Sequence, residues 1–472
     1  MSDTEKRFMS IPVRIEITNY CNRRCDYCFF NDRLTSYKDE MTLEEFNYIL
    51  DLCDREDRKF VFLQGGEPTS HSDFAAFIDI LKKRGFRYGL FTNGIFKSDL
   101  IDRLKVDKED EILINYNHPG TYLNIKEWEL VNRNLEKLAS RNISFNLGYN
   151  LYQDNPDYGY FIDAIKKYKI NHVRWDIARP SEKFTNRFFQ FNDYFKLIPV
   201  MVNFIKAYMK EGCYFNYDCP LPMCVLLRKE FNFINHNTDV TKLTSCGALL
   251  NIGPGLNLAT CPASVVFKDI KLSDFSGLST AEAFLRQEVD KVRWGVWLSD
   301  NCDECIYRVM RECQGGCIGH KRVKCNNIVD RKALELFFSE NKSISSVCDE
   351  TLEMLVAPAE KVTRCINRYN NDLKKGPPDQ YSYYSLGRSY ELLEDYDNAI
   401  KVYEEVLKQD SSCLIANDRL NLVYQLKVVK QNPRNLGAWM RLENALEKMT
   451  GDKKKRDSLV RQYKARYAPN SQ

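Results

Sequence analysis

Short apolar segments alternate with amphipathic segments over roughly the first 180 residues. Six of them have the length and composition of β-strands: 12–19, 59–64, 87–92, 111–116, 143–150 and 172–178. Helical patterns fit between them, and one begins at Thr42, where Glu45 three residues later completes a capping box. This alternation is typical of βα units around a parallel sheet. We therefore predict a partial (β/α)6 barrel of TIM type, with its chemistry at the carboxyl ends of the strands.

The pattern changes after residue 212, where the predicted barrel domain (11–212) ends. Residues 213–348 are rich in Cys, Gly and Pro and show few periodic runs, as expected where metal clusters replace a large apolar core. A helical linker is predicted over 349–378, and helical repeats over 379–472. The expected order is an α/β barrel, a small Cys-rich iron–sulfur domain and an all-α tail.

Composition excludes several classes of protein. Lys and Arg number 69 and Asp and Glu 65, a balance too even for nucleic acid or an acidic membrane to be the main partner. The first residues lack the apolar core of a signal peptide, and no run of about 18 apolar residues could span a bilayer. We therefore expect a cytoplasmic protein without a membrane or nucleic-acid partner. In such a protein, 17 cysteines indicate metal clusters rather than disulfides.

Three cysteines follow the first predicted strand in the order Cys-x3-Cys-x2-Cys: Cys21, Cys25 and Cys28. Three thiolates can hold three corners of a four-iron cluster and leave the fourth iron open to a small molecule. The alternative is zinc, but a structural zinc site needs four ligands. No fourth Cys or His follows in the loop, which continues Asn31-Asp32-Arg33.

This cysteine order, with Tyr27 before the last cysteine, resembles the cluster loop of radical S-adenosylmethionine (SAM) enzymes. The second strand runs into Gly65-Gly66-Glu67-Pro68, which is similar to the motif that binds the amino group of SAM in that family. The resemblance implies a [4Fe-4S] cluster that binds SAM. Cys21, Cys25 and Cys28 would be catalytic ligands, and these four motif residues would contact SAM.

Polar residues end the later strands as well. Strand three ends in Thr92-Asn93-Gly94, a sequence that supports the shape of the site in relatives. Strand four carries Asn115, which falls where relatives place a polar contact to SAM. Asn150 ends strand five and Arg179 follows strand six, and both are further candidates for contacts to SAM. The alternative for these three is an ordinary strand-end polar side chain that is satisfied by backbone.

A second set of cysteines lies downstream and resembles the SPASM domain, an extension of radical SAM enzymes that holds two auxiliary [4Fe-4S] clusters. The cysteines are Cys246, Cys261, Cys302, Cys305, Cys313, Cys317, Cys325 and Cys348. The resemblance assigns Cys246, Cys261 and Cys317 to one cluster with an upstream ligand, Cys224 in preference to Cys219. It assigns Cys302, Cys305 and Cys313 to the other with a downstream ligand, Cys325 in preference to Cys348. Zinc is again the alternative, because Cys-x2-Cys is also a zinc-ribbon spacing.

The tail carries the positions of a tetratricopeptide repeat between residues 380 and 413, among them Leu386, Gly387, Ala399 and Tyr403. Such units bury their faces by stacking and can form a groove for peptides. A dimerisation surface or a stabilising cap is the alternative.

The resemblance to radical SAM and SPASM enzymes implies an oxidoreductase or maturase that modifies a peptide or protein side chain, for example by a thioether or carbon–carbon crosslink. The tail would recruit the substrate, and a flavodoxin or ferredoxin would supply electrons. Two alternatives stay open: a radical SAM dehydrogenase acting on a sugar or other small molecule, and a tetratricopeptide scaffold with structural clusters.

Overall fold

The computed structural model describes most of the chain. The described residues are 13–37, 39–214, 219–235, 246–247, 249–261, 266–296, 298–324, 359–375, 379–451 and 453–468. Cys325 and Cys348, two of the predicted ligands, lie outside them.

The chain forms two compact units. The first unit comprises 1–220, 246–298 and 317–350, and the second comprises 221–245, 299–316 and 351–472. The Cys-rich segment therefore contributes to both units, which differs from the separate domain expected over 213–348.

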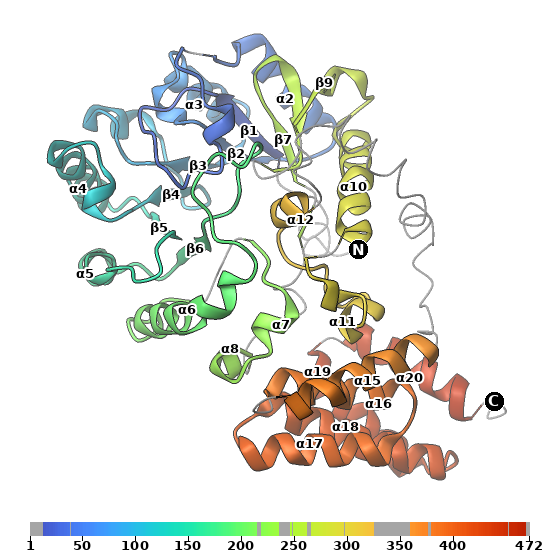
Figure 1. Cartoon of the computed structure of the whole chain (residues 1–472). Coiled ribbons are helices and arrows are strands. Elements are labelled where there is room, and N and C mark those ends of the chain that lie inside the picture. Colours follow the sequence, from blue (N-terminus) through green and yellow to red (C-terminus); the bar gives the residue numbers. More distant parts are fainter. Residues whose placement is uncertain are drawn as a thin grey trace. The chain divides into compact units, whose positions relative to one another are not determined.

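The first unit is built on one sheet with the strand order β6-β5-β4-β3-β2-β1-β7-β8-β9 (Figure 1). Its six N-terminal strands are all parallel and match the six predicted segments. They are β1 Val13–Thr18, β2 Phe60–Gly65, β3 Arg87–Thr92, β4 Glu111–Asn115, β5 Asn146–Leu151 and β6 Val173–Ile177. The predicted parallel βα arrangement is confirmed.

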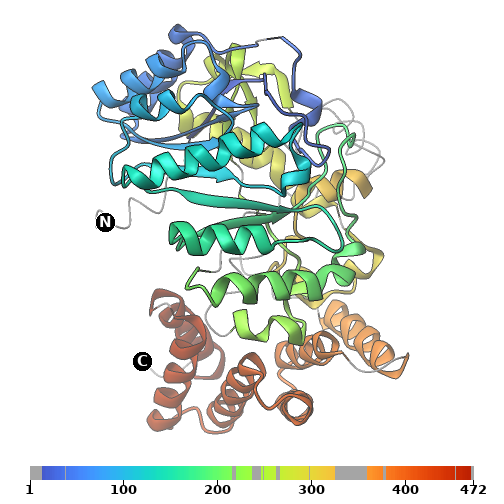
Figure 2. The same ribbon diagram turned by 90° about the vertical axis from the view of Figure 1, so that its left-hand side faces the viewer.

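Helices connect these strands, and Figure 2 shows α4, α5 and α6, coloured cyan to green, side by side. The helices are α2 Leu43–Arg55, α3 Phe74–Lys83, α4 Ile125–Ser140, α5 Gly159–Tyr168 and α6 Asp193–Met209. Short 3-10 helices lie at η1 Asn31–Arg33, η2 Pro68–Ser70, η3 Ser98–Arg103 and η4 Pro119–Thr121. The capping box predicted at Thr42 is present, since Thr42 Oγ1 accepts from the Glu45 amide and Glu45 accepts from the Thr42 amide.

The sheet extends past the predicted strands. β7 Leu250–Ile252 pairs parallel with β1, and β8 Asn257–Ala259 and β9 Val266–Lys271 continue it antiparallel. Between and after them lie η6 Pro254–Leu256, η7 Leu272–Asp274, α10 Leu278–Gly295 and α12 Ile318–Lys324.

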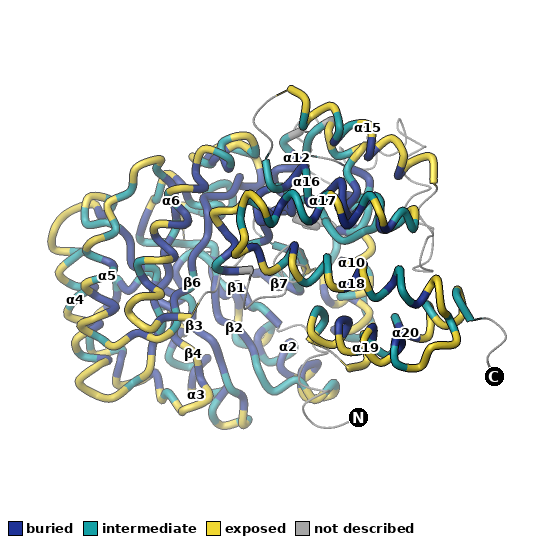
Figure 3. Tube along the Cα trace, turned by 90° about the horizontal axis from the view of Figure 1, so that it is seen from below, coloured by how far each residue is buried: buried dark blue, intermediate teal, exposed yellow. Residues whose placement is uncertain are grey.

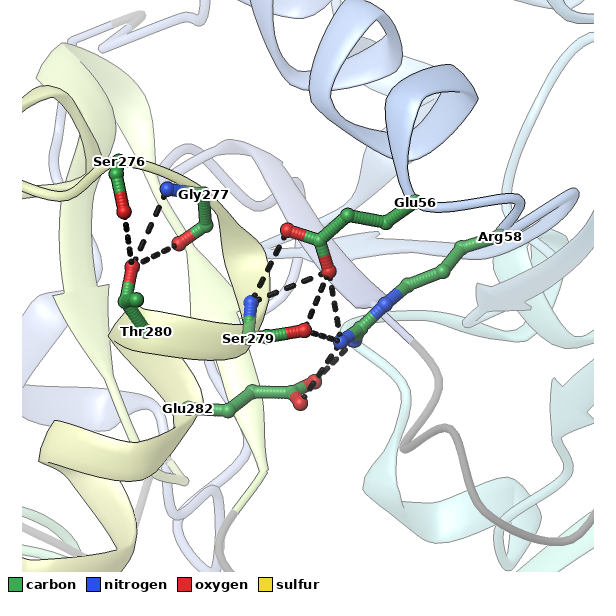
Figure 4. Close-up of polar contacts among 7 residues, drawn as sticks. All are labelled: Glu56, Arg58, Ser276, Gly277, Ser279, Thr280 and Glu282. Carbon is green, nitrogen blue, oxygen red and sulfur yellow. Dashed lines mark hydrogen bonds and ion pairs between the residues drawn. The ribbon is translucent and has the colours of Figure 1, made fainter.

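The start of α10 is fastened to the end of α2 by the polar contacts in Figure 4. The Glu56 carboxylate accepts from the Ser279 amide at 3.2 Å and from its hydroxyl at 2.7 Å. Arg58 donates to the Ser279 hydroxyl at 3.0 Å and pairs with Glu282. Glu56 therefore satisfies amide hydrogens that a helix N-terminus leaves unpaired, in place of a capping residue on the helix itself.

The core of the first unit follows from the apolar strands. Val13, Ile15 and Ile17 of β1 have no exposed surface, and Leu63 and Leu90 on the next two strands are equally buried. Glu16 and Thr18, on the opposite face of β1, are also fully buried. Burial on both faces is typical of parallel strands that are covered on both sides.

The second unit is helical. Its helices are α7 Met223–Leu226, α8 Asn232–Asn235, α11 Ile306–Val309, α15 Ala359–Lys375, α16 Gln380–Leu392, α17 Tyr396–Gln409, α18 Leu414–Gln431, α19 Leu436–Thr450 and α20 Lys453–Tyr467, with η5 Lys229–Phe231 and η8 Asp300–Cys302. Figure 3 shows buried and exposed positions mixed along α17 and α18, as stacked amphipathic helices require. A Cβ on Gly387 would lie 2.6 Å from the Tyr403 ring, so glycine is needed where α16 and α17 meet.

The described part of the predicted linker, α15, is part of this unit, because its Val362, Cys365 and Tyr369 belong to the same apolar core as Tyr403 and Leu442. Within the described part of the chain, we find no helix with the length and apolar character to cross a bilayer.

Candidate active site and cysteine groups

The loop after β1 brings Cys21, Cys25 and Cys28 together. The Cys28 amide donates to the Cys25 carbonyl at 3.1 Å, which closes a turn between the last two cysteines. Burial, and next the Cys25 and Cys21 thiolates, raise the pKa of Cys28 to about 12. The three cysteines are half-buried, and their thiolates would repel one another, so the loop suits a cluster of metal ions that offsets this charge.

Gly65 and Gly66 allow β2 to end directly against this loop. The Gly66 amide donates to the Thr18 carbonyl at 2.7 Å, and the Glu67 amide donates to the Tyr20 carbonyl at 2.8 Å. A Cβ on Gly66 would lie 2.1 Å from the Tyr20 carbonyl oxygen. The sequence pattern predicted close approach of a ligand, and the structure shows close approach of the cysteine loop itself.

Glu67 joins three strand ends. Its carboxylate accepts from the Thr69 hydroxyl at 2.6 Å, the Thr92 hydroxyl at 2.7 Å and the Asn93 amide at 2.7 Å. Only 1% of the residue is exposed, and burial raises its pKa although these hydrogen bonds oppose the shift. The carboxylate thus fixes Thr92-Asn93 beside the cysteines, and Pro68 begins η2 directly after it.

Asn93 and Arg23 direct N–H groups at the first cysteine. The Asn93 side-chain amide lies 3.8 Å from the Cys21 sulfur and donates to Asn22 Oδ1 at 2.7 Å. The Arg23 amide donates to the same sulfur at 3.4 Å. Donors of this kind stabilise the charge on metal-bound thiolates and tune the metal that they hold.

Buried donors near the loop fit a polar cofactor. Asn117 is 1% exposed, and its Nδ2 has no hydrogen-bond partner among the described residues. The same holds for Arg23 Nη1, although Arg23 Nη2 donates to the Thr121 carbonyl at 2.9 Å. Because buried donors are normally satisfied, these two groups suit the carboxylate or hydroxyl oxygens of a ligand such as SAM. The cysteine loop and its surroundings therefore fit the cluster and the cofactor that the sequence implied.

Asn115 and Asn150 meet at the carboxyl ends of β4 and β5. The Asn150 side-chain amide donates to Asn115 Oδ1 at 3.0 Å, and both residues are half-buried. A role in SAM binding stays a prediction for both. Asn117, two residues after Asn115, was not singled out in the sequence, although its place just past a strand end was the available signal.

Arg179 lies in a different environment from the one expected. Its guanidinium pairs with Asp176 at 2.9 Å, donates to the Tyr194 hydroxyl and donates to the Cys219 carbonyl at 3.1 Å. It is 2% exposed. Arg179 therefore holds the Cys219 carbonyl, and its contact to SAM stays a prediction.

Three cysteines of the first unit lie near two buried arginines, and a fourth, Cys246, lies near one of these cysteines. The electrostatic neighbours of Arg179 include Cys219 and Cys317, and those of Arg322 include Cys261 and Cys317. Burial raises the pKa of Cys317 to about 11, and Cys246 adds to the shift. The upstream cysteine near this group is Cys219, whereas the preference was for Cys224; the ligand itself stays a prediction.

Cys224 instead belongs to a group in the second unit. Burial, and then Cys313, Cys305 and Cys302, raise its pKa well above the ordinary value. Cys224, Cys305 and Cys313 also pack against the same apolar core. Spacing alone could not make this choice, because Cys219 and Cys224 are only five residues apart.

Among the residues that the structure describes, no three His, Cys, Asp or Glu side chains converge on the position of a single metal ion. The ligands of a four-iron cluster each bind a different iron, so their sulfur atoms are spread more widely than those around one ion.

Comparison with known proteins identifies the first part of the chain. Residues 15–143 match the model of the radical SAM superfamily. Residues 15–143 are a radical SAM domain. The match contains the cysteine loop, Gly65-Gly66-Glu67-Pro68 and Asn115. A second match, to the tetratricopeptide repeat, covers residues 381–413 and thus α16 and α17.

The chain is similar over part of its length to parts of several enzymes. It is 33% identical over 92 residues to an S-adenosylmethionine-dependent nucleotide dehydratase of Selenomonas ruminantium, covering 18% of this chain and 31% of that protein. It is 37% identical over 87 residues to the tungsten-containing aldehyde ferredoxin oxidoreductase cofactor-modifying protein of Pyrococcus furiosus, covering 18% and 24%. The chain spans 24–39% of the length of the curated relatives compared.

Among solved structures, SuiB of Streptococcus suis bound to S-adenosylmethionine aligns with a TM-score of 0.46 and 14% identity. That alignment covers 66% of this chain and 75% of SuiB.

Proposed function

We propose that the protein is a radical SAM enzyme that oxidatively modifies a side chain of a peptide or protein. The observation that carries the radical part is the cysteine loop after β1, which is packed against Gly65-Gly66 and receives N–H groups from Arg23 and Asn93. When bound, a reduced [4Fe-4S] cluster and SAM would supply a 5′-deoxyadenosyl radical that abstracts hydrogen from the substrate.

The protein groups have separate parts in this proposal. Cys21, Cys25 and Cys28 would hold the cluster, and Glu67 keeps the Thr92-Asn93 turn against it. Asn117 and Arg23 offer buried donors to SAM, and Gly65, Gly66, Pro68, Asn115 and Asn150 shape the same end of the sheet.

We also propose two auxiliary [4Fe-4S] clusters. Cys219, Cys246, Cys261 and Cys317 would hold the first, where the buried cations Arg179 and Arg322 offset the charge of four thiolates. Cys302, Cys305 and Cys313 would contribute to the second. Fully ligated clusters do not bind substrate, so electron transfer to or from the active site is their proposed part.

The peptide or protein substrate is supported by the tetratricopeptide match, because such helix pairs form surfaces that bind extended or helical peptides. A flavodoxin or ferredoxin is the proposed electron donor.

Deuterium transfer tests the substrate class. An extract of fully deuterated cells would be separated by ultrafiltration into a macromolecular and a small-molecule fraction, and each would be incubated with reduced enzyme and unlabelled SAM. We expect deuterium in 5′-deoxyadenosine only with the macromolecular fraction, and its loss after that fraction is treated with protease. Deuterium transfer from the small-molecule fraction alone would contradict a peptide or protein substrate.

A further inference from the structure

The cysteines of the second group lie in a segment with little regular structure. Residues 299–316 contain only the short helices η8 and α11, and Cys302, Cys305 and Cys313 lie at their edges or beyond them. Such a segment needs outside contacts to fix three ligand side chains. Helices α15 and α16 of the second unit provide them.

An arginine and a tyrosine of α15 hold the backbone of this segment. Arg368 of α15 donates to the carbonyls of Asn301 and Glu304, the latter at 3.2 Å. The Ile306 amide donates to the Tyr369 hydroxyl at 3.2 Å. These contacts fix the segment immediately before and after Cys305.

A second arginine holds the far end of the segment. Arg388 of α16 is 6% exposed and donates to Glu312 at 2.8 Å, next to Cys313. It also pairs with Glu391, and Glu391 pairs with Arg419 of α18 at 3.3 Å. The tetratricopeptide helices thereby bind the cysteine segment through a buried ion-pair network. Removing one partner of such a network lowers the stability of the fold, because the other charge is left buried and unpaired.

Tyr381 of α16 contacts a cysteine directly. Its hydroxyl lies 3.4 Å from the Cys305 sulfur, and 5% of the residue is exposed. A metal-bound thiolate has no proton to donate, so the tyrosine hydroxyl must be the donor in that state. This hydrogen bond would stabilise added negative charge on a cluster at this site.

Cys224, from an upstream segment, packs against the same apolar core as Cys305 and Cys313. It lies on α7, and Arg228 one turn later donates to the Cys224 carbonyl at 3.1 Å. The Arg228 guanidinium lies 5.8 Å from the centre of the Tyr381 ring and pairs with Asp379 at the start of α16. The residue that orders Cys224 is therefore tied to the helix that carries Tyr381.

We propose that Cys224 is the fourth ligand of the second auxiliary cluster, with Cys302, Cys305 and Cys313. We assign Tyr381 as a positioning residue whose hydrogen bond to the Cys305 sulfur sets the reduction potential of that cluster. Helix α16 of the tetratricopeptide match then lines the site of this cluster, in addition to any part in recruiting substrate. This inference rests on the auxiliary clusters of the proposed function.

Iron content and spectroscopy test the ligand. The anaerobically reconstituted wild-type chain should hold about 12 irons if it carries three four-iron clusters. Cys224→Ser should lose about 4 of these, or lose one iron and gain the paramagnetic signal of a three-iron cluster. Cys325→Ser is the matched control and should retain the wild-type iron content. The reverse result, with Cys325→Ser losing the cluster and Cys224→Ser keeping it, would overturn the ligand assignment, as would zinc in place of iron.

The reduction potential tests Tyr381. Tyr381→Phe keeps the ring and should keep the iron content, but should shift the potential of one cluster to a more negative value. Tyr307→Phe is the control, because the Tyr307 hydroxyl is buried in the same unit and has no hydrogen-bond partner among the described residues. Equal potentials in wild type and Tyr381→Phe would overturn the assignment of Tyr381.

Two different results would contradict this inference and the proposed function. If the wild-type chain cleaves SAM but holds only about 8 irons, the radical chemistry is supported and the second auxiliary cluster is contradicted. If the chain holds all three clusters but does not cleave SAM, the radical chemistry is contradicted and the ligand assignment is not affected.

Discussion

Gly66 is the position where a single added methyl group should disrupt the cysteine loop. In Gly66→Ala the new Cβ would lie 2.1 Å from the Tyr20 carbonyl oxygen, 2.4 Å from its carbon and 3.0 Å from the Cys21 nitrogen. Ordinary contact would require the Tyr20–Cys21 backbone to retreat by roughly 1 Å. Neither neighbour is a flexible side chain, so the loop itself must move.

The displacement allows an estimate of the effect. Overpacking of this kind typically costs about 1–3 kcal/mol of unfolding free energy. A shift of about 1 Å at a reacting centre can cost about 100-fold in rate, and we expect a loss of that order in the formation of 5′-deoxyadenosine.

The assay compares Gly66→Ala with wild type and with Gly159→Ala, whose Cβ would meet its nearest atom at an ordinary 3.4 Å. All three proteins would be reconstituted anaerobically, and iron content, denaturant unfolding and SAM cleavage would be measured. We expect only Gly66→Ala to lose iron and cleavage. Wild-type iron content and cleavage in Gly66→Ala would refute the close packing of β2 against the loop.

Three further substitutions probe the first unit. Asn93→Ala should lower SAM cleavage by about 10–100-fold with the fold intact by circular dichroism, because it removes a donor to the loop sulfur; an unchanged rate would exclude this role. Arg179→Met leaves Asp176 buried without its ion-pair partner, so the free energy of unfolding in urea should fall by about 3–5 kcal/mol. The additional substitution Asp176→Asn should restore part of this loss. A loss within the error of the measurement would contradict a stabilising ion pair. Glu56→Ala removes the acceptor at the start of α10 and should cost about 0.5–2 kcal/mol in the same assay, whereas an unchanged stability would show that this cap is dispensable.

The barrel strands could be predicted because their pattern is local. Predicted and observed bounds agree within one residue at both ends for β1, β2, β3, β4 and β6, since apolar runs end where polar site residues begin. β7 has three residues, too few to show a period, and its pairing with β1 joins segments more than 200 residues apart. That extension of the sheet was not predictable from local pattern.

The candidate site also has a part that could be predicted from local sequence and a part that could not. The cysteine loop and Gly65-Gly66-Glu67-Pro68 are contiguous motifs, so the sequence displayed them directly. Thr92, which donates to Glu67, lies on the next strand, and Tyr194 and Cys219, which accept from Arg179, lie on α6 and in the segment before α7. Such contacts are tertiary, which is why Arg179 was expected at SAM and was found beside Cys219.

The assignment of Cys219 and Cys224 also required the structure. Pro220 and Pro222 lie between the two cysteines, and Pro222 is extended with φ −72° and ψ 152°. The chain passes from the first unit to the second between Pro220 and Leu221. Two cysteines that are close in sequence therefore belong to different groups.

The most direct test of the radical chemistry is the response of the reduced, reconstituted protein to SAM, measured by electron paramagnetic resonance together with the yield of 5′-deoxyadenosine. We predict that SAM changes the spectrum of one cluster and that the nucleoside forms. Both effects should be absent in the variant with Cys21, Cys25 and Cys28 all changed to Ala. A spectrum that is indifferent to SAM with no nucleoside formed, or equal cleavage by the triple variant, would contradict the account.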